Sequence, residues 1–313
     1  MTKSGIHLVA GSGTVGSSLA LILAESGIDV VVATRSGSGP KHPKIKLLSI
    51  NMNDFSMLYK AVPNAVAVYN CINPPYHRWA QEWPAMAQTF LSYAENTGAV
   101  LVTCSNLYGY GPVHVPMVES LPLVATFANG KIRAQMWIDA KAMNDAGRIR
   151  ATEVRGSDYI AANEQSRLGW RVIPKVLKGK SVQLLGDVNQ KHSWTAPIDV
   201  ARLMMALATD SRAWGKAWHV PSNPPRTQRE AIDDLAKAAG VPSVKVSTVP
   251  KLILGLLGIF NPMFRALRET EYQMGRPFII DDTATRQTFG LAPTPWKEIL
   301  TQTLTTYKKQ LVE

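Results

Sequence analysis

The sequence predicts an α/β fold in which helices cover both faces of a parallel β-sheet. Short runs of apolar and β-branched residues recur through the first half of the chain, and segments long enough to form helices separate them. Wholly apolar strands that alternate with helices are typical of parallel sheets buried on both faces. The predicted strands are residues 6–10, 28–34, 45–50, 65–71, 99–104 and 149–155.

Helices are predicted from the spacing of apolar residues and from capping residues. Helical spacing appears over residues 15–26, 131–146 and 197–209. In the sequence TQRE, the Thr227 side chain can accept a hydrogen bond from the backbone amide of Glu230, and the Glu230 carboxylate can accept one from the backbone amide of Thr227. This reciprocal arrangement is a capping box. We therefore predict that another helix begins at Thr227, and we expect it to end at Gly240.

The length of 313 residues allows one large domain or two modest ones. The regular alternation of strands and helices stops after about residue 156, and no repeat or low-complexity linker is present. We predict a nucleotide-binding domain over residues 1–155, with a later contribution near 195–222. A smaller, discontinuous domain, mainly for substrate binding, is predicted over residues 156–313.

Composition and charge restrict the classes of function. Apolar residues make up 46% of the chain and charged residues 18%, which is ordinary for a globular protein with a sizeable core. The formal charge is +11, but lysines and arginines are dispersed and no run of five or six basic residues occurs. This favours an anionic ligand, such as a phosphorylated cofactor, over nucleic acid.

The remaining composition signals favour a cytoplasmic protein without a metal or a membrane span. Cys71 and Cys104 lie in apolar runs without CxxC spacing, which predicts buried free thiols in a reducing compartment. The N-terminal apolar run is too short for a signal peptide. The apolar run at residues 252–260 is about half as long as the roughly 20 apolar residues that a membrane-spanning helix needs. We therefore expect this run to be a buried segment or the wall of a lipophilic pocket. The six histidines show no metal-binding spacing.

A glycine-rich segment, GSGTVG, directly follows the first predicted strand and directly precedes a predicted helix. In this context Gly11 permits a tight turn, Gly13 lets the backbone approach a pyrophosphate, and Gly16 allows close packing of the helix on the sheet. The helix N-terminus then stabilises the negative charge of the pyrophosphate. The sequence thus predicts a Rossmann-like doubly wound fold that binds a dinucleotide. The candidate cofactor residues are Gly11, Ser12, Gly13, Thr14, Val15 and Gly16.

The end of the second strand predicts which nicotinamide cofactor is bound. An acidic residue here would bind the ribose hydroxyls of NAD, but the sequence has Thr34, Arg35 and Ser36. These residues offer a cation and hydroxyl groups to a 2′-phosphate, which favours NADP(H). The alternative is that Arg35 is a solvated residue at the end of a strand.

Four further segments occur in the order typical of one enzyme superfamily. They are SINMND at 49–54, TCSNLYG at 103–109, RGSDYIAAN at 155–163 and TAPIDVARLM at 195–204. Together with the glycine loop, the chain resembles the short-chain dehydrogenase/reductase superfamily, in its extended, NAD-dependent epimerase/dehydratase branch. The resemblance covers nearly the whole chain. It implies a nicotinamide cofactor, a small-molecule substrate and a homodimer.

The resemblance also implies a catalytic Ser, Tyr and Lys, with the last two in a YxxxK spacing. By position, Ser105 matches the serine and Lys131 matches the lysine, whereas Phe127 stands at the place of the tyrosine. A phenylalanine cannot donate a proton. The chain is therefore similar to the atypical group of the superfamily, which binds the cofactor but lacks the usual tyrosine.

Several nearby residues are candidates for the missing polar roles. Tyr108 and Tyr110 follow Ser105 at the carboxyl end of a strand, where doubly wound folds bind ligands, and either tyrosine is a candidate proton donor. Arg133 could hold an anionic substrate, or it could lie on a solvated helix face. Asn73, in the segment NPPY, could contact the cofactor ribose, or the segment could form only a rigid turn.

Three functions remain open after this reasoning. The leading hypothesis is an NADPH-dependent reductase or related oxidoreductase that acts on a small organic substrate. The second is a non-catalytic NADP(H)-binding redox sensor or partner-binding protein, which would explain Phe127 without a replacement donor. The third, a nucleotide-sugar epimerase or dehydratase, is disfavoured because its chemistry also depends on the missing tyrosine.

Overall fold

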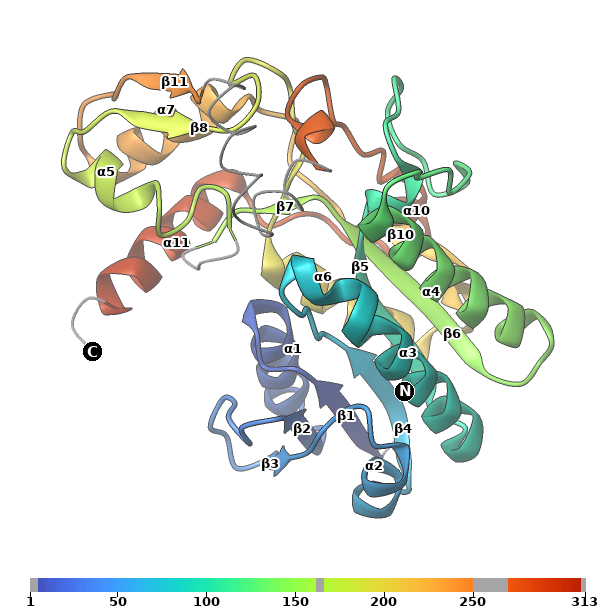
Figure 1. The fold of residues 1–313 in the computed structure, drawn as a ribbon. Coiled ribbons are helices and arrows are strands. Elements are labelled where there is room, and N and C mark those ends of the chain that lie inside the picture. The colour runs from blue at the N-terminus through green and yellow to red at the C-terminus, as the bar shows by residue number, and fades with distance from the viewer. Residues whose placement is uncertain (1–4, 162–165, 250–269, 311–313) are drawn as a thin grey trace. The chain divides into compact units, whose positions relative to one another are not determined.

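The computed structural model describes residues 5–161, 166–249 and 270–310, and the chain divides into two compact units (Figure 1). The apolar run at 252–260 lies outside the described residues. The first unit consists of Met1–Gly109, Leu123–Gly156 and Ile198–His219. The second unit consists of Tyr110–Pro122, Ser157–Pro197 and Val220–Glu313.

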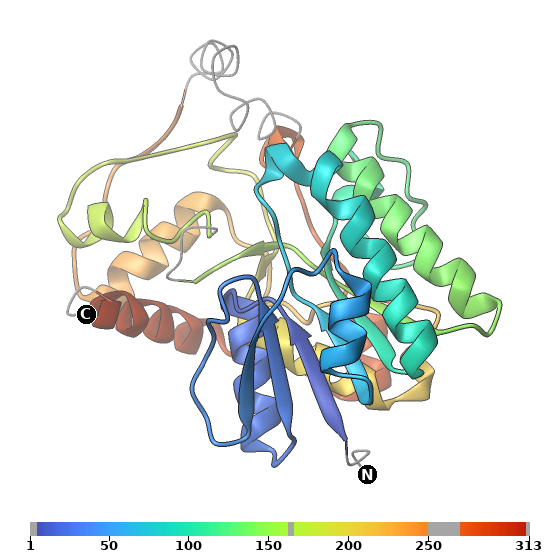
Figure 2. The same cartoon turned by 60° about the horizontal axis from the view of Figure 1, so that its bottom comes forward.

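A seven-stranded parallel sheet forms the centre of the first unit, with strand order β10-β6-β5-β4-β1-β2-β3. The first three strands along the chain lie side by side in Figure 2. The order reverses at β1, because β2 lies on one side of it and β4 on the other. The strands are β1 (Ile6–Ala10), β2 (Val30–Thr34), β3 (Ile45–Ser49), β4 (Ala65–Asn70), β5 (Val100–Asn106), β6 (Arg150–Gly156) and β10 (Ala217–His219).

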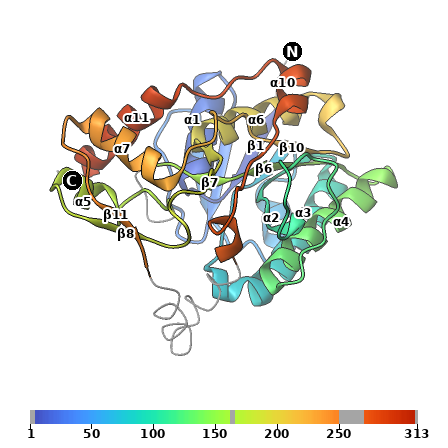
Figure 3. The ribbon, with the colours of Figure 1, turned by 90° about the horizontal axis from the view of Figure 1, so that it is seen from above.

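Helices cover both faces of this sheet. Figures 2 and 3 show α1 and α6 on one face and α2, α3 and α4 on the other, where α3 and α4 pack against each other. Buried leucines, valines and aromatic residues fill the layers between the helices and the sheet. The helices are α1 (Thr14–Glu25), α2 (Phe55–Ala61), α3 (Trp79–Thr97), α4 (Ala128–Asp145) and α6 (Pro197–Thr209).

The predicted α/β fold is confirmed, and each predicted strand and helix is present with ends within three residues of the prediction. The central strands are buried on both faces, as their unbroken apolar character indicates. The sequence analysis did not find β10, because a strand of three residues carries too little periodicity to be read.

The second unit contains short strands and several helices. Its strands form two pairs, β8 with β11 and β7 with β9, and α7 packs against α5 and α11. Its elements include β7 (Asp158–Tyr159), α5 (Ile173–Leu177), β8 (Val182–Leu184), β9 (Trp194–Thr195), α7 (Gln228–Ala239), β11 (Val246–Thr248), α10 (Thr283–Phe289) and α11 (Trp296–Gln310). None of the helices among the described residues is both long and apolar enough to cross a membrane.

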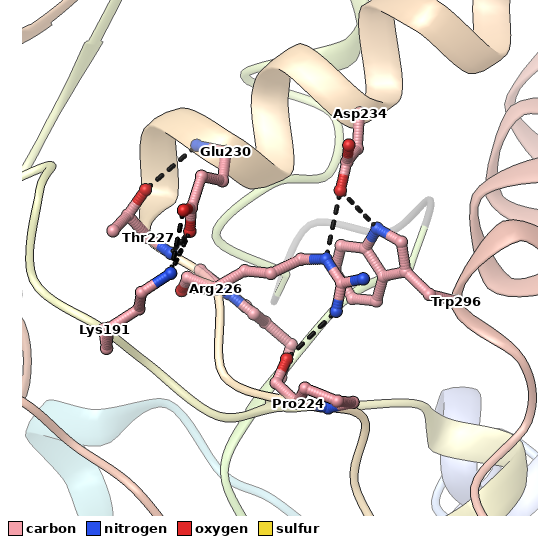
Figure 4. Close-up of polar contacts among 8 residues, drawn as sticks. Lys191, Pro224, Arg226, Thr227, Glu230, Asp234 and Trp296 are labelled. Carbon is pink, nitrogen blue, oxygen red and sulfur yellow. Dashed lines mark hydrogen bonds and ion pairs between the residues drawn. The ribbon is translucent and has the colours of Figure 1, made fainter.

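The start of α7 shows how polar groups are satisfied in the second unit (Figure 4). The predicted capping box is present, with Thr227 and Glu230 bonded reciprocally, and α7 ends at Gly240 in the left-handed conformation. Lys191 lies against the Glu230 carboxylate with both oxygens 2.8 Å from its Nζ. The Glu230 carboxylate is therefore bonded both to the helix cap and to Lys191.

Candidate functional site

The glycine loop connects β1 to α1 beside the end of β4. Gly11 has a φ of +96°, and a Cβ at this position would lie 2.9 Å from the carbonyl oxygen of Cys71. A Cβ at Gly16 would lie 2.1 Å from the carbonyl oxygen of Gly11, so α1 can approach the loop this closely only with glycine there. These contacts give the first and third glycines the roles that the sequence predicts.

The N-terminus of α1 has the character of an anion site. Its N-cap residue, Gly13, gives no side-chain capping bond, and no acidic residue lies in the first turn. A Cβ built on Gly13 would meet no atom within 4 Å, and Gly13 and Thr14 are both exposed. The helix N-terminus and its dipole thus suit a phosphate group, so the loop fits a bound dinucleotide.

Arg35 directly follows β2, next to the glycine loop. The amide of Gly11 donates to the carbonyl oxygen of Ala33 at 2.9 Å, which fixes the loop beside this strand end. The Arg35 side chain is exposed, and it forms no ion pair or side-chain hydrogen bond within the described part of the chain. The neighbouring Ser36 hydroxyl lies 2.7 Å from the Ser38 hydroxyl. The cation is therefore free to contact a ligand.

Ser105 lies at the carboxyl end of β5, at the same edge of the sheet as the glycine loop. Its register partner on β6 is Arg155, and the Ser105 side chain is 6% exposed. Because the order of strands reverses at β1, this edge is where doubly wound folds bind their ligands. Ser105 is thus in a position to line a site that begins at the glycine loop.

Phe127 and Lys131 do not lie on the buried face of α4. Phe127 is the N-cap residue, outside the helix, and its ring lies against Gly130. Lys131 is exposed in the first turn. The buried positions of the first two turns are instead Asn129, Gly130, Arg133 and Ala134. The catalytic role of Lys131 remains a prediction.

The two candidate tyrosines have different surroundings. Tyr108 belongs to the first unit, and its hydroxyl lies 2.9 Å from the hydroxyl of Tyr76. Tyr76 is half-buried, so this pair of hydroxyls extends from a buried position toward the surface. Tyr110 is completely buried and belongs to the second unit. The catalytic role of either tyrosine remains a prediction.

Arg133 is buried, so the alternative that it lies on a solvated helix face is wrong. Its side chain extends from α4 to α3, where the guanidinium lies over the rings of Trp79 and Trp83. Its Nη2 donates to Asn73 Oδ1 at 3.3 Å. Sequence reasoning missed these two tryptophans, although their spacing of four residues places them on one face of a helix.

The cysteines are free, as predicted, but both are only partly buried. Burial raises the pKa of the Cys71 thiol, whose Sγ lies 3.9 Å from the sulfur of Met204. A thiol with a raised pKa is a weak nucleophile. Within the ranges that the structure describes, no cluster of three or more potential metal ligands occurs.

The glycine loop, the uncapped helix and the polar strand ends define a dinucleotide-binding α/β protein. A model of the NAD-dependent epimerase/dehydratase family matches residues 7–220, which is more than half of the chain. The protein belongs to this family, and the resemblance inferred from the sequence is confirmed. No curated protein matches the chain.

Solved structures with this fold include several sugar-nucleotide enzymes. UDP-glucose 4-epimerase from Thermotoga maritima, solved with UDP-glucose, is 16% identical with a TM-score of 0.80, over 98% of this chain and 100% of its own. An epimerase from Methanothermobacter thermautotrophicus is 17% identical with a TM-score of 0.80, and the match covers 99% of this chain and 94% of that protein. dTDP-glucose 4,6-dehydratase from Bacillus anthracis, solved with NAD, is 16% identical with a TM-score of 0.76, and the match covers 98% of this chain and 97% of that protein. At these identities the likeness establishes the fold.

Proposed function

We propose that the protein is an NADPH-dependent oxidoreductase that reduces a small organic substrate. Membership of a family described as NAD-dependent supports a nicotinamide dinucleotide. The preference for the phosphorylated cofactor rests on one observation. Arg35, at the end of β2 beside the glycine loop, is exposed and has no ion pair with any residue that the structure describes, and no carboxylate occurs in the segment that follows the strand. A guanidinium in this position suits a 2′-phosphate.

Reduction fits the polar groups better than sugar epimerisation or dehydration does. The family resemblance implies a tyrosine, with its acidity increased by a lysine, that exchanges the proton of the reacting oxygen. No tyrosine occurs in α4, and its buried first turns carry Asn129 and Arg133 instead. An epimerase must both oxidise and reduce its substrate, so it needs a base and an acid in turn. A reductase needs only a proton donor.

The residues around Ser105 can supply that proton. When bound, the nicotinamide supplies a hydride to the substrate carbon. We assign Ser105 to hydrogen-bond the substrate oxygen and Tyr108 to donate a proton to it. The Tyr76 hydroxyl, 2.9 Å from that of Tyr108, can then pass a proton to Tyr108 and, because Tyr76 is only half-buried, regain one from solvent. Ser105 forms no hydrogen bond with any other described side chain, which leaves its hydroxyl available.

Cofactor titrations test the preference for NADPH. We expect NADPH to bind more tightly than NADH, and Arg35→Ala to remove most of the difference. A charge-assisted contact is worth about 1.5–3 kcal/mol, so the loss should be roughly 10- to 100-fold in affinity for NADPH alone. Lys46→Ala is the control, because Lys46 is an exposed cation on the adjacent β3. Equal affinity of the parent protein for both cofactors would overturn the preference.

Turnover separates the reductase from the non-catalytic sensor. NADPH consumption is measured against a panel of carbonyl, imine and activated-alkene compounds. Consumption with at least one class supports the reductase. Tight NADPH binding without turnover on any compound would favour the sensor, which Phe127 at the place of the tyrosine also suits.

A further inference from the structure

The Arg133 guanidinium lies between two indole rings inside the first unit. Its central carbon is 4.5 Å from the ring centroid of Trp79 and 4.4 Å from that of Trp83. Both tryptophans are completely buried in α3, and Arg133 itself is only 5% exposed. The cation is therefore held in a fixed position by two aromatic faces, in surroundings that contain little water.

The hydrogen-bonding groups of this guanidinium are largely unused. Its Nε and Nη1 are fully buried and have no partner. Its Nη2 reaches Asn73 Oδ1 at 3.3 Å, which is long compared with the roughly 2.7–2.9 Å of a charge-assisted bond. Within the described ranges no carboxylate forms an ion pair with Arg133, because the nearby Glu153 carboxylate pairs with Arg155 at 2.7 Å.

Burial of this cation without a counter-charge is costly. Loss of solvation lowers the pKa of Arg133, which is the expected sign for a buried base, although nearby groups oppose the shift. Cation–π contacts recover about 2 kcal/mol when desolvated, whereas the penalty for burying an ion is several kcal/mol. Binding sites typically contain residues that are rigidly held although they reduce the stability of the ligand-free protein.

We propose that Arg133 binds a carboxylate of the substrate, which displaces Asn73 and bridges Nη1 and Nη2. The end of a guanidinium presents these two nitrogens as a fork that matches the two oxygens of a carboxylate. Nη2 is held only by the long bond to Asn73, which is exposed, and the buried Nη1 beside it has no partner, so displacement of the Asn73 amide would open this fork to a ligand.

The neighbours of Arg133 indicate what else the ligand carries. Tyr76 stacks on Trp79 with ring centroids 4.9 Å apart, and the ring of Tyr108 lies 6.0 Å from that of Trp79. The carboxylate site is thus next to the rings of Tyr76 and Tyr108, whose hydroxyls are assigned to proton transfer. This step rests on the proposed function: a substrate held at Arg133 and reduced beside Tyr108 is a small oxo acid, with its carbonyl close to its carboxylate.

Equilibrium binding to the purified full chain tests the site without requiring turnover. The probes are pyruvate and benzoate, each compared with its neutral amide, and they are titrated with and without NADPH. The proteins are the parent, Arg133→Met, Arg133→Lys and the control Lys141→Met, which removes an exposed cation from the same helix. We expect the parent to prefer the acids, Arg133→Met to lose at least tenfold in affinity for them, Arg133→Lys to lose less, and Lys141→Met to match the parent.

Thermal unfolding supplies a result that a structural role would not give. Removal of an unpaired buried charge should leave the melting temperature of Arg133→Met unchanged or raise it by roughly 2–4 °C. A lower melting temperature together with unchanged acid binding would overturn the proposal. So would equal affinity of the parent for acids and amides, or tighter binding of inorganic phosphate than of either acid. Failure to bind NADPH would overturn the proposed function alone.

Discussion

Arg133 in the first unit and Arg226 in the second both lie on tryptophan faces, but their partners differ. The Arg226 guanidinium is 4.4 Å from the ring centroid of Trp296. Its Nε donates to Asp234 Oδ2 at 3.0 Å and its Nη1 donates to the carbonyl oxygen of Pro224 at 3.0 Å. Figure 4 shows that Trp296 also donates to this carboxylate. Arg133 has two indole rings and, among the described residues, no carboxylate partner.

This difference separates a structural arginine from one that is available to a ligand. Around Arg226 the charge, the Nε and Nη1 donors and the Trp296 indole N–H each have a partner within the second unit. Around Arg133 the aromatic contacts fix the position of the cation but leave its Nε and Nη1 without a partner among the described residues. Because an unsatisfied buried ion costs stability, the two regions should respond to substitution in opposite ways.

The largest expected effect belongs to Tyr108, in the first unit. Tyr108→Phe removes the proposed proton donor and should lower turnover about a hundredfold, while NADPH affinity stays close to that of the parent. Steady-state kinetics on a substrate that is turned over, together with a cofactor titration, measure both quantities. Tyr59→Phe is the control, because Tyr59 is exposed on α2. Full activity of Tyr108→Phe would show that the donor is another group.

Asp158 tests whether the paired ions of the second unit contribute to stability. Burial alone would raise its pKa, but Arg167, 3.0 Å away, and His192, 2.9 Å away, outweigh burial and lower it. Asp158→Asn should therefore reduce the free energy of unfolding by about 2–3 kcal/mol at pH 7.

The pH dependence of this effect has a definite sign. A carboxyl group whose folded-state pKa is lowered stabilises the protein above its unfolded pKa of about 3.9, and it loses this contribution as the pH falls below that value. Urea unfolding should show the gap between parent and Asp158→Asn narrowing by about 1 kcal/mol between pH 7 and pH 3. If the difference in the free energy of unfolding instead widens as the pH falls, the pKa of Asp158 is not lowered in the folded protein.

The direct comparison of the two arginines predicts opposite signs. Arg226→Met should lower the free energy of unfolding by about 1–2 kcal/mol, since it removes two hydrogen bonds and a cation–π contact from a partly exposed position. Arg133→Met should leave the free energy of unfolding unchanged or increase it. Denaturant titrations measure the free energy of unfolding of both variants. A similar loss of stability in both would show that Arg133 and Arg226 do not differ in this respect.

The smallest effect is expected at Lys191, which contacts the exposed Glu230 carboxylate. Exposed ion pairs contribute about 0–1 kcal/mol and are screened by salt. Lys191→Met should therefore lower stability by less than about 0.5 kcal/mol, and the loss should disappear in 1 M NaCl. Thr227→Ala is the comparison, because a lost helix cap costs about 1 kcal/mol at either salt concentration. A large, salt-independent effect at Lys191 would show that this pair is not a simple surface contact.

Most of the fold could be predicted from local patterns. Wholly apolar strands such as 65–71 give parallel central strands, because only a sheet covered on both faces buries every side chain. The capping box at Thr227 located α7, since its hydrogen bonds depend only on residues within one turn. The short strand β10 and the two-residue strands of the second unit depend on distant partners, so no local signal could reveal them.

The candidate site likewise has features that the sequence predicts and features that depend on tertiary packing. The sequence by itself determined the glycine loop, because the roles of Gly11 and Gly16 follow from backbone sterics over a few residues. Only the tertiary structure decided which residues of α4 are buried, since the helix is polar on several sides and its sequence favours no face. Packing of α4 on α3 exposes Lys131 and places Arg133 between Trp79 and Trp83, which are about fifty residues away along the chain.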